Sequence, residues 1–381
     1  MITRREILDK HKSKRGKISI NSKVKINNSR DLAIVYTPGV AQVCLEIHKD
    51  KKKSYDFTSR ANMVGIITDG TAVLGLGDIG PEAATPVMEG KSILFKELAG
   101  IDAFPISLDT KDTDKIIDTI KYLQPNFAAI NLEDISAPRC FEIEQRLQKE
   151  LDIPVFHDDQ HGTAIVALAA LINSAKLLNK KIKNLKVVVS GAGAAGIAIT
   201  KLFYKYGIKE ILVIDSKGIV SKDRKDLNIY KKEILIANKK NITGGLAEAI
   251  VGADVFVGVS KGGVLKKQMV TKMNKDSIVF AMSNPTPEIM PELAKKAGAK
   301  IIGTGRSDFP NQINNALVFP GFFKGILLGK HKQVVDGMKI VAAEALAKSI
   351  KKPTKNKIVP NVLDKKVVLA IAKAVAKYKV R

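Results

Sequence analysis

The sequence has few cysteines and no long apolar run, and each absence excludes a class of protein. Only Cys44 and Cys140 occur in 381 residues, too few for a disulfide framework, and neither lies in a C-x-x-C or similar metal-ligand spacing. No uninterrupted run of about 18 apolar residues occurs, which argues against a membrane-spanning helix. Residues 1–17 are mostly polar and lack the apolar stretch of a signal peptide. We therefore expect a cytoplasmic protein with reduced thiols and no membrane partner.

Acidic residues are scarce relative to basic ones. The chain has 63 Lys and Arg against 38 Asp and Glu, a formal net charge of +25, and such an excess can reflect binding to nucleic acid or to anionic membranes. The lysines are nevertheless dispersed, and the basic runs at 49–53 and 351–357 contain no aromatic residue that could stack on bases. We interpret the charge as a lysine-rich solvated surface and expect no nucleic-acid partner. A nucleic-acid-binding protein remains the alternative, and a salt-dependent gel shift would reveal it.

Three stretches of the chain differ in pattern. The length of 381 residues exceeds one ordinary core, and the hydrophobic content of 45% is that of a globular protein. Residues 1–159 mix short apolar runs with helical stretches, whereas residues 160–314 alternate apolar strands with helices, and residues 315–381 are mostly helical. We predict an α/β fold with two parts. A Rossmann-type doubly wound parallel sheet is joined to an α/β catalytic domain, which the C-terminal helices complete by packing back on it.

A glycine-rich turn in the segment KVVVSGAGAAG predicts a dinucleotide site. Gly191, Gly193 and Gly196 lie between a β-branched strand and a helix. There they permit a tight turn, close approach of the backbone to a pyrophosphate and close packing of the helix, whose N-terminus attracts the anion. Asp215 ends the next apolar segment, at the distance along the chain where an acid binds the ribose hydroxyls of NAD. Lys217 could instead reach the 2′-phosphate of NADP, so both dinucleotides stay open.

Two acidic pairs follow apolar segments. Glu133 and Asp134 come after AINL, and Asp158 and Asp159 come after IPVFH. Because parallel strands end at the same edge of a sheet, the first pair and one or both of the second pair could converge there. Converging carboxylates need a compensating cation. Ligation by oxygen alone suits Mg²⁺ or Mn²⁺, with positions left open for water or substrate.

Two histidines flank the second acidic pair. His157 and His161 are four residues apart, a spacing that would place both on one face of a helix, although the glutamate of the zinc motif H-E-x-x-H is missing. A zinc hydrolase that needs no nucleotide is therefore an alternative. The HGTA segment is more typical of a helix entry packed against a sheet, which favours structural histidines.

Several segments resemble the malic enzyme family in its short prokaryotic form, and they follow the family's order through most of the chain. They are YTPGVA, TDGTAVLGLGDIG, PVMEGKSILFKELAGIDAFPI, NLEDISAP, PVFHDDQHGTAI, SGAGAAG, SNPTPE and GRSDFPNQINNALVFPG. The resemblance implies oxidative decarboxylation of (S)-malate to pyruvate and CO₂, with reduction of NAD⁺ or NADP⁺, a divalent metal and a homodimer. A redox-neutral malolactic or oxaloacetate decarboxylase, sharing the metal and cofactor sites, is the alternative.

The resemblance also implies roles for individual residues. Lys91 matches the family's general base and Tyr36 its general acid, while Asp158 matches the acid that supports the catalytic lysine. Residues 1–159 would then bind malate and the metal, and residues 160–314 would bind the dinucleotide. The positions that match the metal ligands are Glu133, Asp134 and Asp159.

The cofactor residues are expected in the glycine turn, at the end of the following strand and in two later segments. Asn284 of SNPT and Asn315 of QINNALVF match family residues that contact substrate and cofactor. At one position the sequence departs from larger relatives, because Val73 stands where they carry an arginine that holds a substrate carboxylate. The residues expected at the cofactor are Gly191, Ala192, Gly193, Ala194, Ala195, Gly196, Asp215, Asn284 and Asn315.

Overall fold

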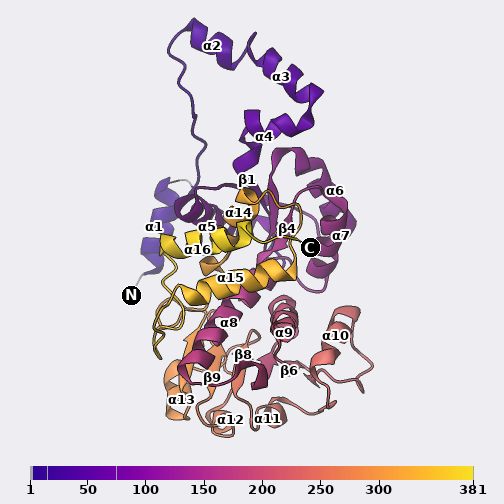
Figure 1. Cartoon of the computed structure of the whole chain (residues 1–381), viewed down its shortest axis with the longest axis vertical. Helices are drawn as coiled ribbons and strands as arrows, with labels where there is room; N and C mark the ends of the chain where they lie inside the picture. Colours follow the sequence, from indigo (N-terminus) through magenta and orange to yellow (C-terminus); the bar gives the residue numbers. More distant parts are fainter. Residues whose placement is uncertain (1–2, 15, 74, 381) are drawn as a thin grey trace.

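The computed structural model of the chain describes residues 3–14, 16–73 and 75–380. Two β-sheets form the body, and helix α8 (Asp158–Leu177) runs from the end of the first sheet toward the second (Figure 1). The segment AIVALAALINSA in α8 is apolar on nearly all sides, as expected of a helix buried within a protein, so α8 joins both sheets in one core. None of the described helices, α8 included, has the length and apolar run that crossing a bilayer requires.

The first sheet has four parallel strands in the order β2-β1-β3-β4. Strands β1, β3 and β4 are almost entirely buried, because helices cover both faces of a parallel sheet. All four strands end at one edge, so the loops after β1, β3 and β4 are neighbours. The elements are β1 (Met63–Thr68), α5 (Pro81–Leu94), a π-helical segment (Phe95–Ala99), β2 (Asp102–Ser107), α6 (Thr113–Leu123), β3 (Ala129–Leu132), α7 (Arg139–Glu150) and β4 (Val155–His157).

The second sheet has six strands in the order β10-β9-β8-β5-β6-β7, all parallel except the short β7. Side chains of β5 alternate between two cores, since Val187 and Val189 face α8 and α9 while Val188 faces the opposite layer. The chain order reverses between β5 and β8, and ligands bind in the crevice outside the carboxyl ends of the strands at such a point.

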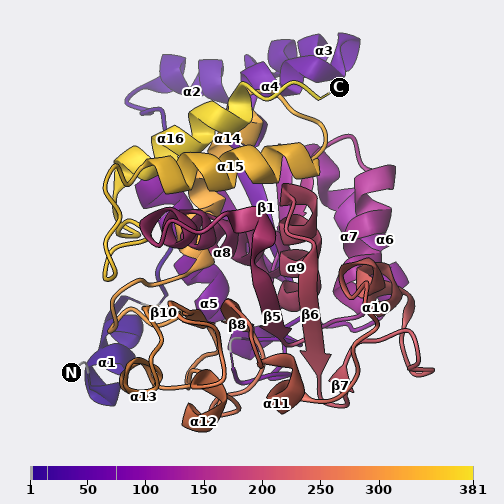
Figure 2. The same ribbon diagram turned by 60° about the horizontal axis from the view of Figure 1, so that its bottom comes forward.

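Figure 2 shows β5 and β6 with α9 against them. The elements of this sheet are β5 (Lys186–Ser190), α9 (Ala194–Tyr206), β6 (Glu210–Asp215), β7 (Gly218–Ile219), α10 (Ile229–Glu233), α11 (Leu246–Ala249), β8 (Val255–Gly258), α12 (Lys267–Val270), β9 (Ile278–Ala281), α13 (Pro291–Lys296) and β10 (Ile301–Thr304). Helices on both faces of a parallel sheet confirm the predicted Rossmann-type doubly wound domain.

The C-terminal helices return to the first sheet. The ring of Phe319 lies 4.8 Å from that of Phe95, and the ring of Phe322 lies 4.7 Å from that of Phe156, measured between centroids. These aromatic contacts hold α14 against the π-helical segment and β4, while α15 packs on α8 and α16 packs on α14. The three helices are α14 (Phe319–Leu328), α15 (Asp336–Lys348) and α16 (Lys365–Ala376).

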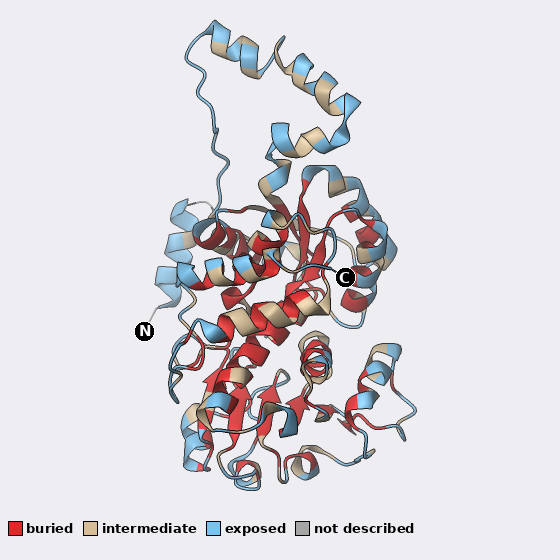
Figure 3. Cartoon of the chain, viewed as in Figure 1, coloured by how far each residue is buried: buried red, intermediate tan, exposed pale blue. Residues whose placement is uncertain are grey.

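Residues 18–57, which we call the arm, extend away from the body after helix α1 (Arg4–Lys14). Figure 1 shows the arm beyond one end of the first sheet, and Figure 3 shows it without a buried residue. Many of its apolar side chains are exposed to solvent in the single chain. These side chains include Ile20, Val24, Ile26, Ile34 and Leu45. The arm carries α2 (Ser29–Val35), α3 (Val40–Lys49) and α4 (Ser54–Phe57).

Candidate active site

The two acidic pairs meet at the edge where the strands of the first sheet end. Strands β3 and β4 are neighbours in register, so the residues that follow them come side by side. Carboxylate oxygens of Glu133, Asp134 and Asp159 all lie within 4.8 Å of one another. The backbone N–H of Asp134 also donates to Oδ2 of Asp159 at 2.8 Å. The structure thus brings together the three residues expected to bind a metal.

Lys91 reaches this edge from α5 and is buried. Its Nζ forms an ion pair with Asp158 and lies 2.5 Å from Oε2 of Glu133, and it sits 4.4 Å from the centre of the Phe319 ring. Burial lowers the pKa of Lys91, but the charges of Asp158 and Glu133 outweigh it and raise that pKa above its ordinary value. The side chain is therefore an ammonium in this structure.

The carboxyl groups of the cluster have raised pKa values. Burial raises the pKa of Asp158 and of Glu133 to about 7, and that of Asp159 to about 6, although the Lys91 ammonium opposes the change. One ammonium does not balance the four carboxylates gathered here, and a divalent cation would offset two more of their negative charges. Three oxygen donors at this spacing fit Mg²⁺ or Mn²⁺.

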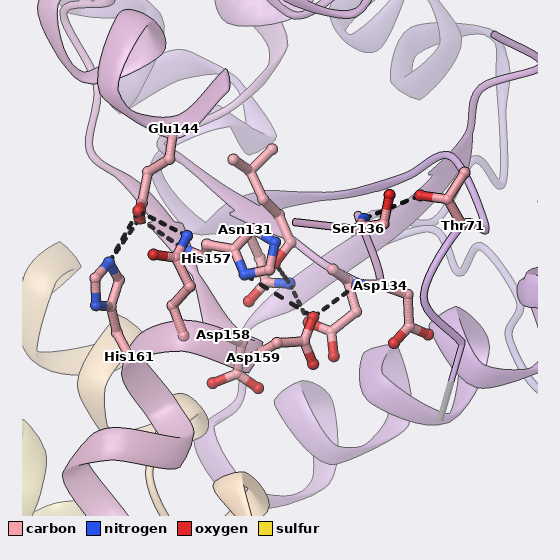
Figure 4. A network of polar contacts seen from close by, with 12 residues as sticks. Thr71, Asn131, Asp134, Ser136, Glu144, His157, Asp158, Asp159 and His161 are labelled. Carbon is pink, nitrogen blue, oxygen red and sulfur yellow. Dashed lines mark hydrogen bonds and ion pairs between the residues drawn. The ribbon is translucent and has the colours of Figure 1, made fainter. Parts of the chain in front are cut away.

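Glu144 of α7 fixes the corner between β4 and α8 (Figure 4). Its buried carboxylate accepts hydrogen bonds from the backbone N–H of His157 at 2.8 Å and from Nε2 of Gln160 at 3.1 Å, and pairs with Nε2 of His161 at 2.9 Å. Burial raises the pKa of Glu144, but His161 outweighs it and lowers that pKa to about 2. This charged anchor holds the backbone that presents the second acidic pair.

The two histidines do not share a helix face, contrary to the expectation from their spacing. His157 ends β4, and α8 begins at Asp158, because two acidic side chains in its first turn favour a helix N-terminus there. His161 pairs with Glu144 instead. In the described part of the chain, the group of side chains that could hold a metal ion consists of carboxylates and includes neither histidine.

The glycine turn joins β5 to α9 as the sequence predicted. Gly191 has a φ of +119°, which favours glycine, and a Cβ at Gly196 would lie 1.7 Å from the Gly191 carbonyl oxygen. A Cβ at Gly193, by contrast, would meet no heavy atom within 4 Å in the described structure. The backbone is therefore open at Gly193, where a pyrophosphate would approach. The intervening residues Ala192, Ala194 and Ala195 are half-buried.

Asp215 ends β6 beside this turn, since the N–H of Gly191 donates to the carbonyl of Ile214 at 2.8 Å. Its carboxylate is not free, because Arg224 and Lys231 both bind it. No local pattern in the sequence indicates these two partners. Lys217 donates its backbone N–H to the same carboxylate and pairs its ammonium with Asp226 instead.

The two expected asparagines lie where the sheets meet. Asn284 follows β9, and a Cβ on Gly75, after β1, would fall 2.0 Å from its carbonyl oxygen. Asn315 lies against α8, since a Cβ added to Gly162 of that helix would lie 3.0 Å from the Cβ of Asn315. The two segments that carry Asn284 and Asn315 thus lie next to the edge that carries the acidic cluster.

Both halves of the chain match one family. Residues 14–148 match the malic enzyme N-terminal domain, and residues 160–380 match the malic enzyme NAD binding domain. The chain belongs to the malic enzyme family. This membership confirms the resemblance seen in the sequence, and it accounts for a Rossmann-type domain joined to a second α/β domain.

Relatives and solved structures of the family match nearly the whole chain. The bifunctional malic/malolactic enzyme of Bacillus subtilis is 54% identical over 99% of this chain and 93% of that protein. The NAD-dependent malic enzyme of Geobacillus stearothermophilus is 53% identical over 94% of this chain and 76% of that protein. The crystal structure of the NAD-dependent malic enzyme of Thermotoga maritima is 48% identical, with a TM-score of 0.94 over 97% of this chain and 98% of that one.

One predicted residue of this malic enzyme family member stands apart from the cluster. Tyr36 follows α2 on the arm, and its side chain is 66% exposed. Figure 1 shows α2 at the far end of the arm, away from α5, which carries Lys91. A single chain therefore does not bring Tyr36 to Lys91.

Sequence reasoning missed three residues that shape this malic enzyme site. Asn131 donates Nδ2 to Oε2 of Glu133 at 2.9 Å, Phe319 lies under the Lys91 ammonium, and Glu144 anchors the β4–α8 corner. The place of Asn131 two residues before an expected ligand was a usable signal. Phe319 lies within the family-like segment GRSDFPNQINNALVFPG, but nothing there indicates its contact with Lys91, and nothing in the local sequence marks Glu144. Val73, where larger relatives carry arginine, is fully buried and offers no charge to a substrate.

Proposed function

We propose that this chain oxidatively decarboxylates (S)-malate to pyruvate and CO₂, with NAD⁺ or NADP⁺ as acceptor and Mg²⁺ or Mn²⁺ as the metal. The observation that carries the proposal is the buried Lys91 ammonium, held by Asp158 and Glu133 beside a set of carboxylates that suits a hard cation. A positioned amine, a metal and a bound dinucleotide are the parts that this reaction needs.

The carboxylates of Glu133, Asp134 and Asp159 would hold the cation. When bound, it would polarise the C2 oxygen of malate as a Lewis acid. The dinucleotide on the glycine turn supplies the acceptor for the C2 hydride. Residues of the chain must then remove the proton of the C2 hydroxyl and deliver one to C3 after CO₂ leaves.

We propose that Lys91 is the base that removes the proton of the C2 hydroxyl. Asp158, Glu133 and the Phe319 ring fix its Nζ before substrate arrives, which removes the entropy of positioning the base. The raised pKa of Lys91 means that the side chain starts as an ammonium, so it must release a proton before it can act as a base. Asp158 and Glu133 are the carboxylates in contact with this ammonium, and a divalent cation bound beside them would favour release of the proton, because a nearby positive charge lowers the pKa of Lys91.

We propose that Tyr36 donates the proton to C3. We further propose that this tyrosine comes from a second copy of the chain. The arm contains no buried residue and carries exposed apolar side chains such as Ile34 and Leu45, which a homodimer would bury. If each arm packs on the other copy, Tyr36 of one chain comes to Lys91 of its partner. The proposed dimer thus completes an active site that a single chain leaves without its acid.

Mixing two inactive variants tests the shared site. Lys91→Ala and Tyr36→Phe are expected to be inactive alone, but a mixed dimer restores one intact site of its two. Co-expression should therefore recover roughly a quarter of wild-type activity if the chains pair at random. As a control, Lys91→Ala is paired with a chain that carries both substitutions and should recover nothing. Activity no higher than that of this control would show that Tyr36 does not act across the dimer.

A redox-neutral malolactic activity is the second candidate, and the name of the 54% identical Bacillus subtilis relative favours it. Lactate would then accumulate without net reduction of dinucleotide. Initial rates with malate, Mn²⁺ and each dinucleotide in turn, with pyruvate, lactate and reduced dinucleotide all measured, decide between the two. Equal amounts of pyruvate and reduced dinucleotide support oxidative decarboxylation. Turnover without nucleotide would contradict both activities.

A further inference from the structure

The carboxylate of Asp215 is saturated with donors. Its Oδ1 accepts from Nη1 of Arg224 at 2.7 Å and from the backbone N–H of Lys217 at 2.9 Å. Its Oδ2 accepts from Nη2 of Arg224 at 3.0 Å and from Nζ of Lys231 at 2.5 Å. A carboxylate has about four lone-pair sites, so these four donors leave none for the hydroxyls of a ribose.

Arg224 is held between two carboxylates. Its Nε and Nη2 also donate to Asp226, at 3.0 and 2.8 Å. Burial raises the pKa of Asp215, but hydrogen bonds from Arg224 and Lys231 outweigh it and lower that pKa to about 2. Asp215 therefore remains ionised and paired, and Arg224 and Lys231 neutralise its negative charge.

The charge of this corner is positive rather than negative. Asp215 and Asp226 carry two negative charges, whereas Arg224, Lys231 and Lys217 carry three positive ones. Lys231 uses one of its three N–H groups on Asp215, and its side chain is 22% exposed, so donors remain for an incoming anion. An unpaired acid at this position selects NAD because it binds the 2′-hydroxyl and repels a 2′-phosphate. Here both effects are removed.

We propose that Lys231 and Arg224 make the subsite at the end of β6 a site for a 2′-phosphate, so that the enzyme prefers NADP to NAD. Arg224 acts as a positioning residue that neutralises Asp215, and Lys231 contacts the phosphate. The assignment rests on the proposed use of a dinucleotide at the glycine turn. It deepens that proposal by naming which dinucleotide is used.

Binding of nucleotide fragments tests the subsite without malate turnover. Titration calorimetry on the full-length enzyme would compare adenosine 2′,5′-bisphosphate with 5′-AMP, which differ by the 2′-phosphate. We expect the bisphosphate to bind at least about tenfold more tightly, the effect of one charge-assisted contact. A smaller preference would overturn the proposal. Because no chemistry is involved, this result is separate from any failure of the enzyme to oxidise malate.

Single-residue variants test whether Lys231 causes the preference for the 2′-phosphate. Lys231→Ala should lose most of the preference for the bisphosphate and keep its affinity for 5′-AMP. Lys240→Ala removes a lysine that pairs with Glu210 at the opposite end of β6 and should keep the wild-type preference. A Lys231→Ala enzyme with the same preference as wild type would remove Lys231 from the subsite. In the intact reaction, kcat/KM with NADP should exceed kcat/KM with NAD, and the reverse order would overturn the proposed preference.

Discussion

At the scale of single residues, the main feature is the ion pairing between Lys91 and the acidic cluster. Four carboxylates gather at one sheet edge, and the structure supplies Lys91 as a buried cation in contact with two of them. Burying charges is unfavourable unless they are paired, and a single ammonium leaves most of the carboxylate charge in this cluster uncompensated.

Removing the amine should remove the base. We expect Lys91→Ala to lower kcat by about 10² or more, the size of effect that loss of acid–base catalysis produces. Lys96→Ala is a matched control, because Lys96 lies five residues further on and pairs with Asp102 at the surface. Steady-state rates and thermal unfolding of both variants are the measurements. Wild-type turnover in a folded Lys91→Ala enzyme would refute the assignment.

Removing one oxygen ligand should remove the metal. Asp159→Ala is expected to abolish Mn²⁺-dependent activity and to weaken Mn²⁺ binding measured by calorimetry, because two carboxylates remain of three. Asp152→Ala, at an exposed position before β4, should leave both unchanged. An Asp159→Ala enzyme with the wild-type Mn²⁺ affinity would take this residue out of the site.

Glu144 offers a test of the anchor behind the cluster. Glu144→Gln removes the charge and one acceptor oxygen, and leaves one of three buried donors without a good partner. We expect the free energy of unfolding to fall by about 1–3 kcal/mol. Glu142→Gln, on the exposed side of the same helix, should have little effect. Equal denaturation midpoints for the two variants would contradict the anchoring role.

The residues that could be read from the sequence are those tied to a local pattern. Glu133 and Asp158 could be placed because each follows an apolar strand, and parallel strands end together. Glu144 could not, because its role depends on a contact between α7 and the start of α8, and a glutamate in a helix has no mark of burial. Arg224 and Lys231 were missed for the same reason, since a charged residue after a strand is usually solvated.

At the scale of elements, the turn between β5 and α9 separates two uses of glycine. Gly196 serves the fold, because a Cβ there would collide with the Gly191 carbonyl oxygen. Gly193 has open space beside it, which leaves room for the predicted dinucleotide. The sequence motif predicts the second glycine beside the pyrophosphate and the third at the helix contact, and the space around Gly193 and Gly196 agrees with that order.

Alanine substitutions should separate these uses. Gly193→Ala is expected to raise the KM for the dinucleotide with little change in the unfolding temperature, since its methyl group takes space that the pyrophosphate needs. Gly196→Ala should lower the unfolding temperature, because the methyl group forces the turn from the helix. Steady-state kinetics and thermal unfolding of each variant are the measurements. A Gly193→Ala enzyme with an unchanged KM would show that the dinucleotide does not pass this residue.

The boundary between β4 and α8 shows why elements are predicted better than their ends. The apolar segment IPVFH indicates a strand, and AIVALAALINSA indicates a helix. The spacing of His157 and His161 suggested that both belong to the helix. Helix α8 begins at Asp158, because Asp158 and Asp159 favour a helix N-terminus there. His157 is therefore the last residue of β4.

At the scale of the whole molecule, the sequence indicates an α/β fold and a doubly wound sheet, and both are confirmed. The boundaries of the three predicted parts, 1–159, 160–314 and 315–381, stay a prediction. The arm was not predicted, because the residues of 18–57 look like any amphipathic segment and nothing local says that they leave the body.

The exposed arm has a consequence for how the enzyme behaves on dilution. If each catalytic centre borrows its tyrosine from another polypeptide, specific activity depends on the concentration of chains and falls once association is no longer favoured. Isolated subunits would then be inactive and prone to aggregate, because the apolar side chains of the arm would face water.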